Sequence, residues 1–200
     1  CCKYIETIAR NLDDYQSSST LATIRKQFLA GERPPGCARC WKDEDAGLKS
    51  KRQLDNEYVF NNDEPNLDSI KVLSLPFGNT CNLSCRICGS YSSSKWYPDE
   101  KKISKDLSWF QLRPLENFKW FENPEFYDEL TKYSEGVEEI YINGGEPTLI
   151  KAHFRYLENL INNGTAAKVH LVYSLNMMDI PDRLIELWKS FMKVTVNASI

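Results

Sequence analysis

Residues 137–163 read VEEIYINGGEPTLIKAHFRYLENLINN, and this stretch decides the fold. Its first six residues are short and β-rich, which predicts a strand over Val137–Ile142. The Gly-Gly-Glu-Pro that follows is typical of a turn. Ala152–Asn163 then repeats apolar residues at helical spacing and stops before Gly164, which predicts an amphipathic helix. A strand, a turn and a helix in this order predict one unit of a parallel α/β sheet.

The same pattern continues on both sides of this stretch. Further strands are predicted over Ser69–Leu75, Val169–Ser174 and Lys193–Ile200. A second helix is predicted over Asp182–Phe191, with Pro181 at its start. Alternating strands and helices imply parallel strands joined by right-handed crossovers. We therefore expect an α/β domain over residues 67–200.

Residues 1–66 differ from the rest of the chain and predict a small, cysteine-rich helical domain. Ser19–Ala30 is amphipathic, and Gly31 suits the end of that helix. A second helix is predicted over Trp41–Leu54, although Gly47 and Ser50 weaken it. Residues 61–66 are polar and turn-rich, which indicates a linker to the second domain.

Residues 94–135 form a long aromatic and charged insertion between the first two strands of the α/β domain. One interpretation is a pair of helices that pack onto the sheet. The other is a wall of a substrate cavity, because aromatic side chains often line ligand clefts. A surface for single-stranded nucleic acid is disfavoured, since the basic residues that follow a phosphate backbone are missing.

Composition excludes several classes of protein. The 200 residues carry 25 Lys and Arg against 28 Asp and Glu, a net charge of −3, so neither nucleic acid nor an anionic membrane is an expected partner. Hydrophobic residues make up 42%, enough for an ordinary globular core. No apolar run approaches the roughly 18 residues of a membrane span, and no signal peptide is recognisable. We expect a cytoplasmic protein.

Seven cysteines stand in three groups, which favours metal binding over a disulfide framework. Cys81, Cys85 and Cys88 follow the first predicted strand of the α/β domain, in the spacing C-x₃-C-x₂-C. Thiolates suit zinc and iron–sulfur clusters. A closed structural zinc site needs four ligands, so a zinc site here would require a distant residue such as His153 or His170. Three thiolates on a cubane cluster instead leave one iron open to an exogenous ligand.

This cysteine motif resembles the signature of radical S-adenosylmethionine (radical SAM) enzymes. The resemblance implies that Cys81, Cys85 and Cys88 hold a [4Fe-4S] cluster whose open iron binds S-adenosylmethionine (SAM). One electron from the cluster would cleave SAM to a 5′-deoxyadenosyl radical, which abstracts hydrogen from a substrate. The family usually has an aromatic residue before the third cysteine, where this chain has Ile87. Its fold implies a partial (β/α) barrel of parallel strands with helices outside. The family usually closes about six such units, so we expect residues 67–200 to be incomplete at the C-terminus.

Further residues resemble family positions that bind SAM. Gly144, Gly145, Glu146 and Pro147 match the GGEP motif that contacts the SAM amino group. Ser174 and Asn176 stand at the third strand's end, near the family's T-N-G position, and Ser199 lies where relatives place a polar residue that contacts the ribose. All lie at the C-terminal ends of successive predicted strands, and ligands bind at that edge of a parallel sheet. We therefore expect one site.

The N-terminal cysteines resemble part of a SPASM/twitch auxiliary-cluster domain. Cys2, Cys37 and Cys40, with Cys1 as a fourth ligand or a spare, would hold a second [4Fe-4S] cluster. A Cys₄ zinc site is the alternative. Such domains usually follow the radical domain, whereas these cysteines precede it.

The leading hypothesis is a radical SAM oxidoreductase that takes electrons from a donor such as flavodoxin or ferredoxin. Relatives with auxiliary clusters often modify peptides or protein side chains, so a peptide is the expected substrate class. Two alternatives stay open. One is a metal-binding module without catalysis, and the other is a truncated radical SAM fragment that binds clusters but turns nothing over. The chain opens with Cys1 rather than Met, which we interpret as processing or as a piece of a longer protein.

Overall fold

The structure is a computed structural model that describes residues 12–60, 70–112 and 119–199. Contacts within the chain divide it into two compact units, Cys1–Asp68 and Ser69–Ile200. Each unit is described by itself.

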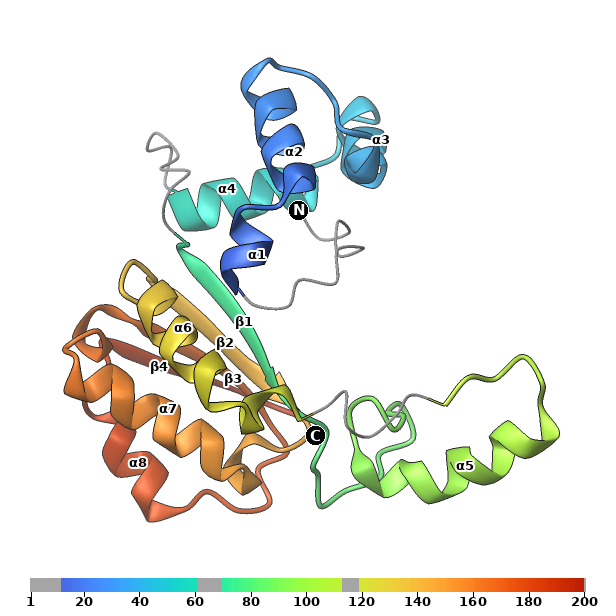
Figure 1. Ribbon diagram of the computed structural model, residues 1–200, viewed down its shortest axis with the longest axis vertical. Coiled ribbons are helices and arrows are strands. Elements are labelled where there is room, and N and C mark those ends of the chain that lie inside the picture. The colour runs from blue at the N-terminus through green and yellow to red at the C-terminus, as the bar shows by residue number, and fades with distance from the viewer. Residues whose placement is uncertain (1–11, 61–69, 113–118, 200) are drawn as a thin grey trace. The chain divides into compact units, whose positions relative to one another are not determined.

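The second unit is built on a four-stranded parallel sheet (Figure 1). The strands lie in chain order, β1-β2-β3-β4, and every neighbouring pair is parallel. They comprise Val72–Phe77 (β1), Glu139–Gly144 (β2), His170–Leu175 (β3) and Lys193–Ala198 (β4). Helix α7 (Lys151–Asn162) connects β2 to β3, and α8 (Asp182–Trp188) connects β3 to β4. The predicted α/β class is confirmed, and the sheet is consistent with a partial barrel.

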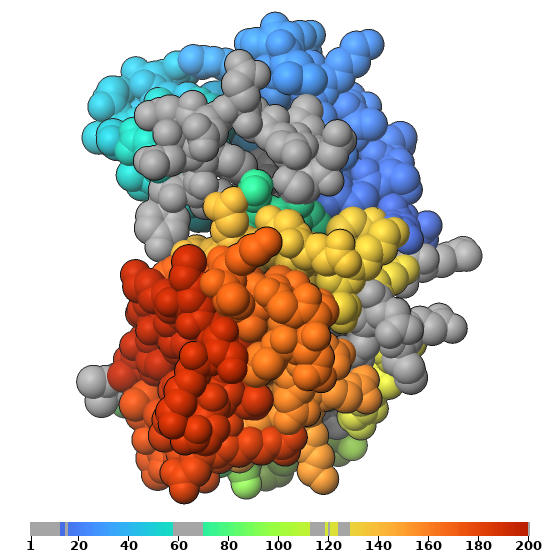
Figure 2. Space-filling view, turned by 90° about the vertical axis from the view of Figure 1, so that its left-hand side faces the viewer, coloured from blue at the N-terminus to red at the C-terminus, as the bar shows by residue number. Residues whose placement is uncertain are grey.

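Alternate side chains of the strands pack against the helices on one face of the sheet. Phe77 lies 6.0 Å from Tyr156 of α7, and Tyr173 lies 5.2 Å from Trp188, the last residue of α8, between ring centroids. The segments from α7 to β4, orange to red in Figure 2, pack into one continuous surface. The opposite row of side chains is mostly polar and exposed or half-exposed, including Ser74, Asn143, Ser174 and Asn197. In a partial barrel with its helices outside, this row would face the interior.

The described part of the insertion contains two α-helices, and they pack differently. Helix α6 (Pro124–Ser134) contacts α7, where Ser134 Oγ and Tyr156 OH hydrogen-bond at 2.7 Å. Helix α5 (Tyr97–Asp106) packs mainly on the short 3₁₀ turn before it, Ser94–Trp96, and extends away from the sheet in Figure 1. The prediction of two helices on the sheet is therefore wrong for α5, because its residues contact the cysteine loop instead.

The first unit is helical, with α1 (Leu12–Gln16), α2 (Ser19–Leu29), α3 (Ala38–Asp45) and α4 (Lys51–Phe60). The single helix predicted over Trp41–Leu54 is wrong. The backbone turns at Gly47, whose φ of +74° favours glycine. Ser50 then begins α4 with a capping box: Ser50 Oγ accepts from Gln53 N at 3.2 Å, and Gln53 Oε1 accepts from Ser50 N at 3.1 Å.

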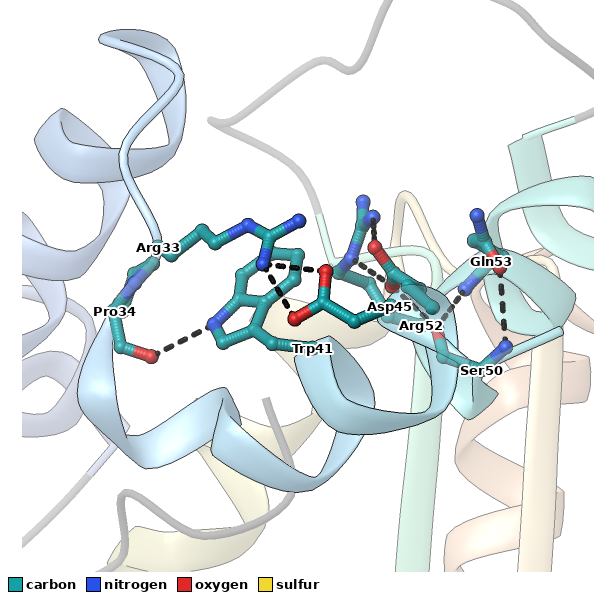
Figure 3. Close-up of polar contacts among 8 residues, drawn as sticks. Arg33, Pro34, Trp41, Asp45, Ser50, Arg52 and Gln53 are labelled. Atoms are coloured by element: carbon teal, nitrogen blue, oxygen red, sulfur yellow. Dashed lines mark hydrogen bonds and ion pairs between the residues drawn. The ribbon is translucent and has the colours of Figure 1, made fainter. Parts of the chain in front are cut away.

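Trp41 contacts both the segment that precedes the Pro35–Cys37 turn and the start of α4 (Figure 3). Its indole N–H donates to Pro34 O at 3.1 Å, and the guanidinium groups of Arg33 and Arg52 lie 5.4 and 4.7 Å from its ring centroid. Hydrogen bonds from Arg52 and Ser50 lower the pKa of Glu44. These contacts join α3 to the start of α4.

Candidate functional site

Cys81, Cys85 and Cys88 lie on the loop that follows β1. All three are free thiols; Cys85 is exposed and the other two are half-buried. Cys88 N donates to Cys85 O at 2.9 Å, which folds the second half of the motif into a turn. Burial, with the neighbouring Cys85 and Cys81, raises the pKa of the Cys88 thiol. The other two thiols of the motif therefore contribute to the electrostatic environment of Cys88.

Four side chains outside the motif hold this loop closed. Asn79 Nδ2 donates to Ser90 O at 2.6 Å, and Ser93 Oγ donates to Leu83 O at 2.5 Å. The indole N–H of Trp96 donates to the carbonyl of Cys85 at 3.0 Å. On α5, Glu100 Oε1 accepts from Ser90 N at 2.8 Å. Sequence reasoning missed these residues, because their partners are backbone groups that no sequence pattern identifies.

The Gly-Gly-Glu-Pro turn lies directly against the loop that precedes the cysteines. Gly145 N donates to Gly78 O at 2.9 Å, and Glu146 N donates to Thr80 O at 2.7 Å. A Cβ on Gly145 would stand 2.1 Å from Thr80 O, and Gly144 has a φ of +122°. Both glycines are therefore required by close backbone approach, before any ligand is considered.

Glu146 and Asn176 form a junction between three loops. Glu146 is 2% exposed; its Oε1 accepts from Thr148 Oγ1 at 3.0 Å, and its Oε2 accepts from Asn176 N at 2.8 Å. Asn176 Nδ2 donates to Asn82 Oδ1 at 2.7 Å and approaches Cys81 Sγ at 3.9 Å. The structure thus brings the cysteine loop, the Gly-Gly-Glu-Pro turn and the end of β3 together.

The other residues singled out near the strand ends take no part in the hydrogen bonds of this junction. Ser174 is exposed on β3 and pairs in register with Asn197 of β4. Ser199 is also exposed, and its backbone N–H donates to Leu175 O at 2.8 Å. Pro147 is buried, and its carbonyl points back toward α7, where it accepts from Ile150 N at 3.1 Å.

The described residues contain no group of three Cys, His, Asp or Glu side chains placed to hold one metal ion. Ligand side chains commonly converge only when the metal binds, and the three neighbouring thiols have the donor chemistry that an iron–sulfur cluster needs. Leu83 N donates to Cys81 Sγ at 3.4 Å. The cysteine loop therefore fits a three-cysteine cluster.

Neither histidine is placed to complete a zinc site with these cysteines. His153 is 0% exposed, and its two ring nitrogens lie 3.1 Å from Pro147 O and 2.7 Å from Tyr173 OH. His170 Nδ1 pairs with Glu139 Oε2 and His170 Nε2 with Thr195 Oγ1, both at 2.9 Å. That pair lies at the amino ends of the strands, away from the cysteine loop.

The N-terminal cysteines are only partly described. Cys37 is buried at the end of a 3₁₀ turn, Pro35–Cys37, and Cys40 is half-buried in the first turn of α3. Three residues of spacing on a helical turn place both side chains on one side. Cys1 and Cys2 lie outside the described residues.

A cavity of about 530 Å³ opens on the helix side of the cysteine loop. Asn79 and Thr80 line one wall, and Lys151 and Arg155 of α7 line another. Phe121 of the insertion also lines it, while its ring lies 6.4 Å from Phe77, between centroids. Phe121 thus serves both interpretations of the aromatic insertion, since it packs on the sheet and lines a cavity.

The chain belongs to the radical SAM superfamily, whose family model, described as "Radical SAM superfamily", matches residues 75–200. The match includes the cysteine loop, the Gly-Gly-Glu-Pro turn and all the residues after β2 discussed above. Members of this superfamily in general bind a [4Fe-4S] cluster and SAM and use a reductant. Comparisons with curated proteins and with solved structures find no match. No helix of the described ranges has the length and apolar character needed to cross a membrane.

Proposed function

We propose that this protein is a radical SAM enzyme that cleaves SAM reductively at a [4Fe-4S] cluster held by Cys81, Cys85 and Cys88. When bound, the cluster supplies one electron and an open iron, and SAM yields a 5′-deoxyadenosyl radical that abstracts hydrogen. The observation that carries the proposal is the junction at Glu146 and Asn176. It holds the thiol-bearing loop against the Gly-Gly-Glu-Pro turn through hydrogen bonds of 2.7–2.8 Å.

Each part of this site has a separate task. The cysteine loop, closed by Asn79 and Trp96, would present its sulfurs to the cluster. Residues 144–147 would present backbone and carboxylate groups to the SAM ammonium. Glu146 already accepts hydrogen bonds on both oxygens, so an ammonium would use the remaining lone pairs. Ser174 and Ser199, exposed near the ends of β3 and β4, would contact the nucleoside.

The finer assignments are part of the same proposal. Residues 1–66 would form the auxiliary domain, with a second [4Fe-4S] cluster on Cys1, Cys2, Cys37 and Cys40, and residues 67–200 the radical domain. A flavodoxin or ferredoxin would supply electrons, and the substrate would be a peptide or protein side chain. Cys37 is buried and lies one helical turn before Cys40, so the two thiols can bind the same metal or cluster. Their placement supports a metal centre in residues 1–66.

Anaerobic reconstitution with iron and sulfide tests the function. Dithionite and SAM should then give 5′-deoxyadenosine, with about eight irons per chain for two clusters and about four for one. Cys85→Ala should abolish 5′-deoxyadenosine formation. Cys37→Ala is the matched control, because it should lower iron while the radical cluster remains. Undiminished product with Cys85→Ala would refute the assignment, and a colourless protein carrying zinc would favour the non-catalytic module.

A further inference from the structure

Two buried hydrogen bonds in series connect β3 to the Gly-Gly-Glu-Pro turn. His153 of α7 contacts Pro147 O with Nδ1 at 3.1 Å and Tyr173 OH with Nε2 at 2.7 Å. A carbonyl oxygen only accepts, so Nδ1 carries the proton and donates. Nε2 is then the acceptor, and the hydroxyl of Tyr173 donates to it. The direction of both hydrogen bonds of His153 is therefore fixed.

Burial keeps both His153 and Tyr173 neutral. His153 and Tyr173 are each 0% exposed. Burial lowers the pKa of His153 to about 3, despite the opposing hydrogen bond to Pro147. Burial also raises the pKa of Tyr173 above its ordinary value, so its hydroxyl stays a donor. The hydrogen bonds thus persist throughout the physiological pH range.

Glu146 and Pro147, two successive residues of the turn, are both held by residues at the end of β3. Asn176 holds the carboxylate of Glu146 at 2.8 Å, and Tyr173 holds the carbonyl of Pro147 through His153. Aromatic rings surround the imidazole, with Phe77 at 5.7 Å and Phe154 at 5.2 Å between centroids. An apolar side chain could fill this space but would leave the buried Tyr173 hydroxyl without its acceptor, so the histidine serves these polar contacts and not packing alone.

We propose that His153 and Tyr173 are positioning residues that hold the turn at 144–147 in the shape that binds SAM. The inference rests on the proposed function and assigns these two buried side chains a task in it. They touch no ligand; they act through the carbonyl of Pro147. Loss of the Tyr173 hydroxyl would leave Nε2 of His153 without its donor and free the imidazole to turn away from Pro147.

The test compares two tyrosines of the same core. Tyr173→Phe removes the hydroxyl that donates to His153, whereas Tyr156→Phe removes a hydroxyl bonded at 2.7 Å to Ser134 of α6. Both side chains are 0% exposed, so both variants should lose similar stability. SAM affinity of the anaerobically reconstituted protein should weaken about threefold to tenfold in Tyr173→Phe and stay unchanged in Tyr156→Phe.

Two further readouts separate positioning from folding. His153→Asn keeps a donor near the position of Nδ1 and should retain more SAM affinity than His153→Leu. In protein without cluster or SAM, Tyr173→Phe should speed amide hydrogen exchange at residues 148–150, and Tyr156→Phe should not. Equal SAM affinity and equal exchange in the two tyrosine variants would overturn the inference. If wild-type protein binds no SAM, the proposed function fails, and the exchange comparison still decides whether this pair holds the turn.

Discussion

Gly145→Ala tests whether close contact between two loops builds the site. The added Cβ would stand 2.1 Å from Thr80 O and 2.6 Å from two further backbone carbons. These are backbone atoms, so no side chain can move aside. The loops would have to separate by about 1.3 Å to reach the 3.4 Å of ordinary contact. That separation strains the hydrogen bonds Gly145 N to Gly78 O and Glu146 N to Thr80 O.

The expected loss of stability follows from these contacts. Overpacking costs about 1–3 kcal/mol, and weakening two backbone hydrogen bonds adds about 1 kcal/mol, which gives roughly 2–4 kcal/mol. Gly164→Ala is the matched control: its φ is +77°, but nothing lies within 4 Å of an added Cβ. The control should cost only the left-handed penalty, about 1 kcal/mol.

Urea unfolding of the cluster-free protein measures both variants. Gly145→Ala should shift the midpoint more than Gly164→Ala. After reconstitution it should also retain less iron, because Thr80 directly precedes Cys81. Equal midpoints for the two variants, together with wild-type iron content in Gly145→Ala, would refute the claim that backbone approach at Gly145 shapes the site.

Three further predictions concern single side chains. Trp96→Phe keeps a ring but removes the indole donor to Cys85 O, so iron should be lost to a chelator several-fold faster; Trp109→Phe, at a side chain 75% exposed, should match wild type. The folded-state pKa of His153, about 3, lies below its ordinary 6.5. The contribution of His153 to stability is therefore complete above pH 6.5, and stability falls below that pH by about 1.4 kcal/mol per pH unit. Urea titrations from pH 7 to 4 should show a shallower fall in His153→Asn. Trp41→Leu should lower the thermal midpoint of the first unit by several degrees in calorimetry, because Arg33, Arg52 and the Pro34 carbonyl lose their contacts with the indole; an unchanged midpoint would contradict that role.

Local patterns in the sequence were enough to predict the sheet and its connecting helices. Val137–Ile142 and Val169–Ser174 overlap β2 and β3, because buried parallel strands require compact β-rich runs. The helix end before Gly164 was also predictable, since its φ of +77° favours glycine. The break between α3 and α4 was missed, although Ser50 and Gln53 carry a recognisable capping-box spacing.

The sequence by itself determined the donor groups of the candidate site: three spaced thiols and a glycine pair at a strand end. These are properties of residue type and spacing, which can be read from the sequence without knowing the tertiary contacts. Only the tertiary structure decided that Asn176 joins Cys81 to Glu146 and that His153 faces Pro147 and Tyr173, rather than a metal. Such contacts join residues up to 95 positions apart, and only parallel pairing of β1, β2 and β3 brings them to one edge of the sheet.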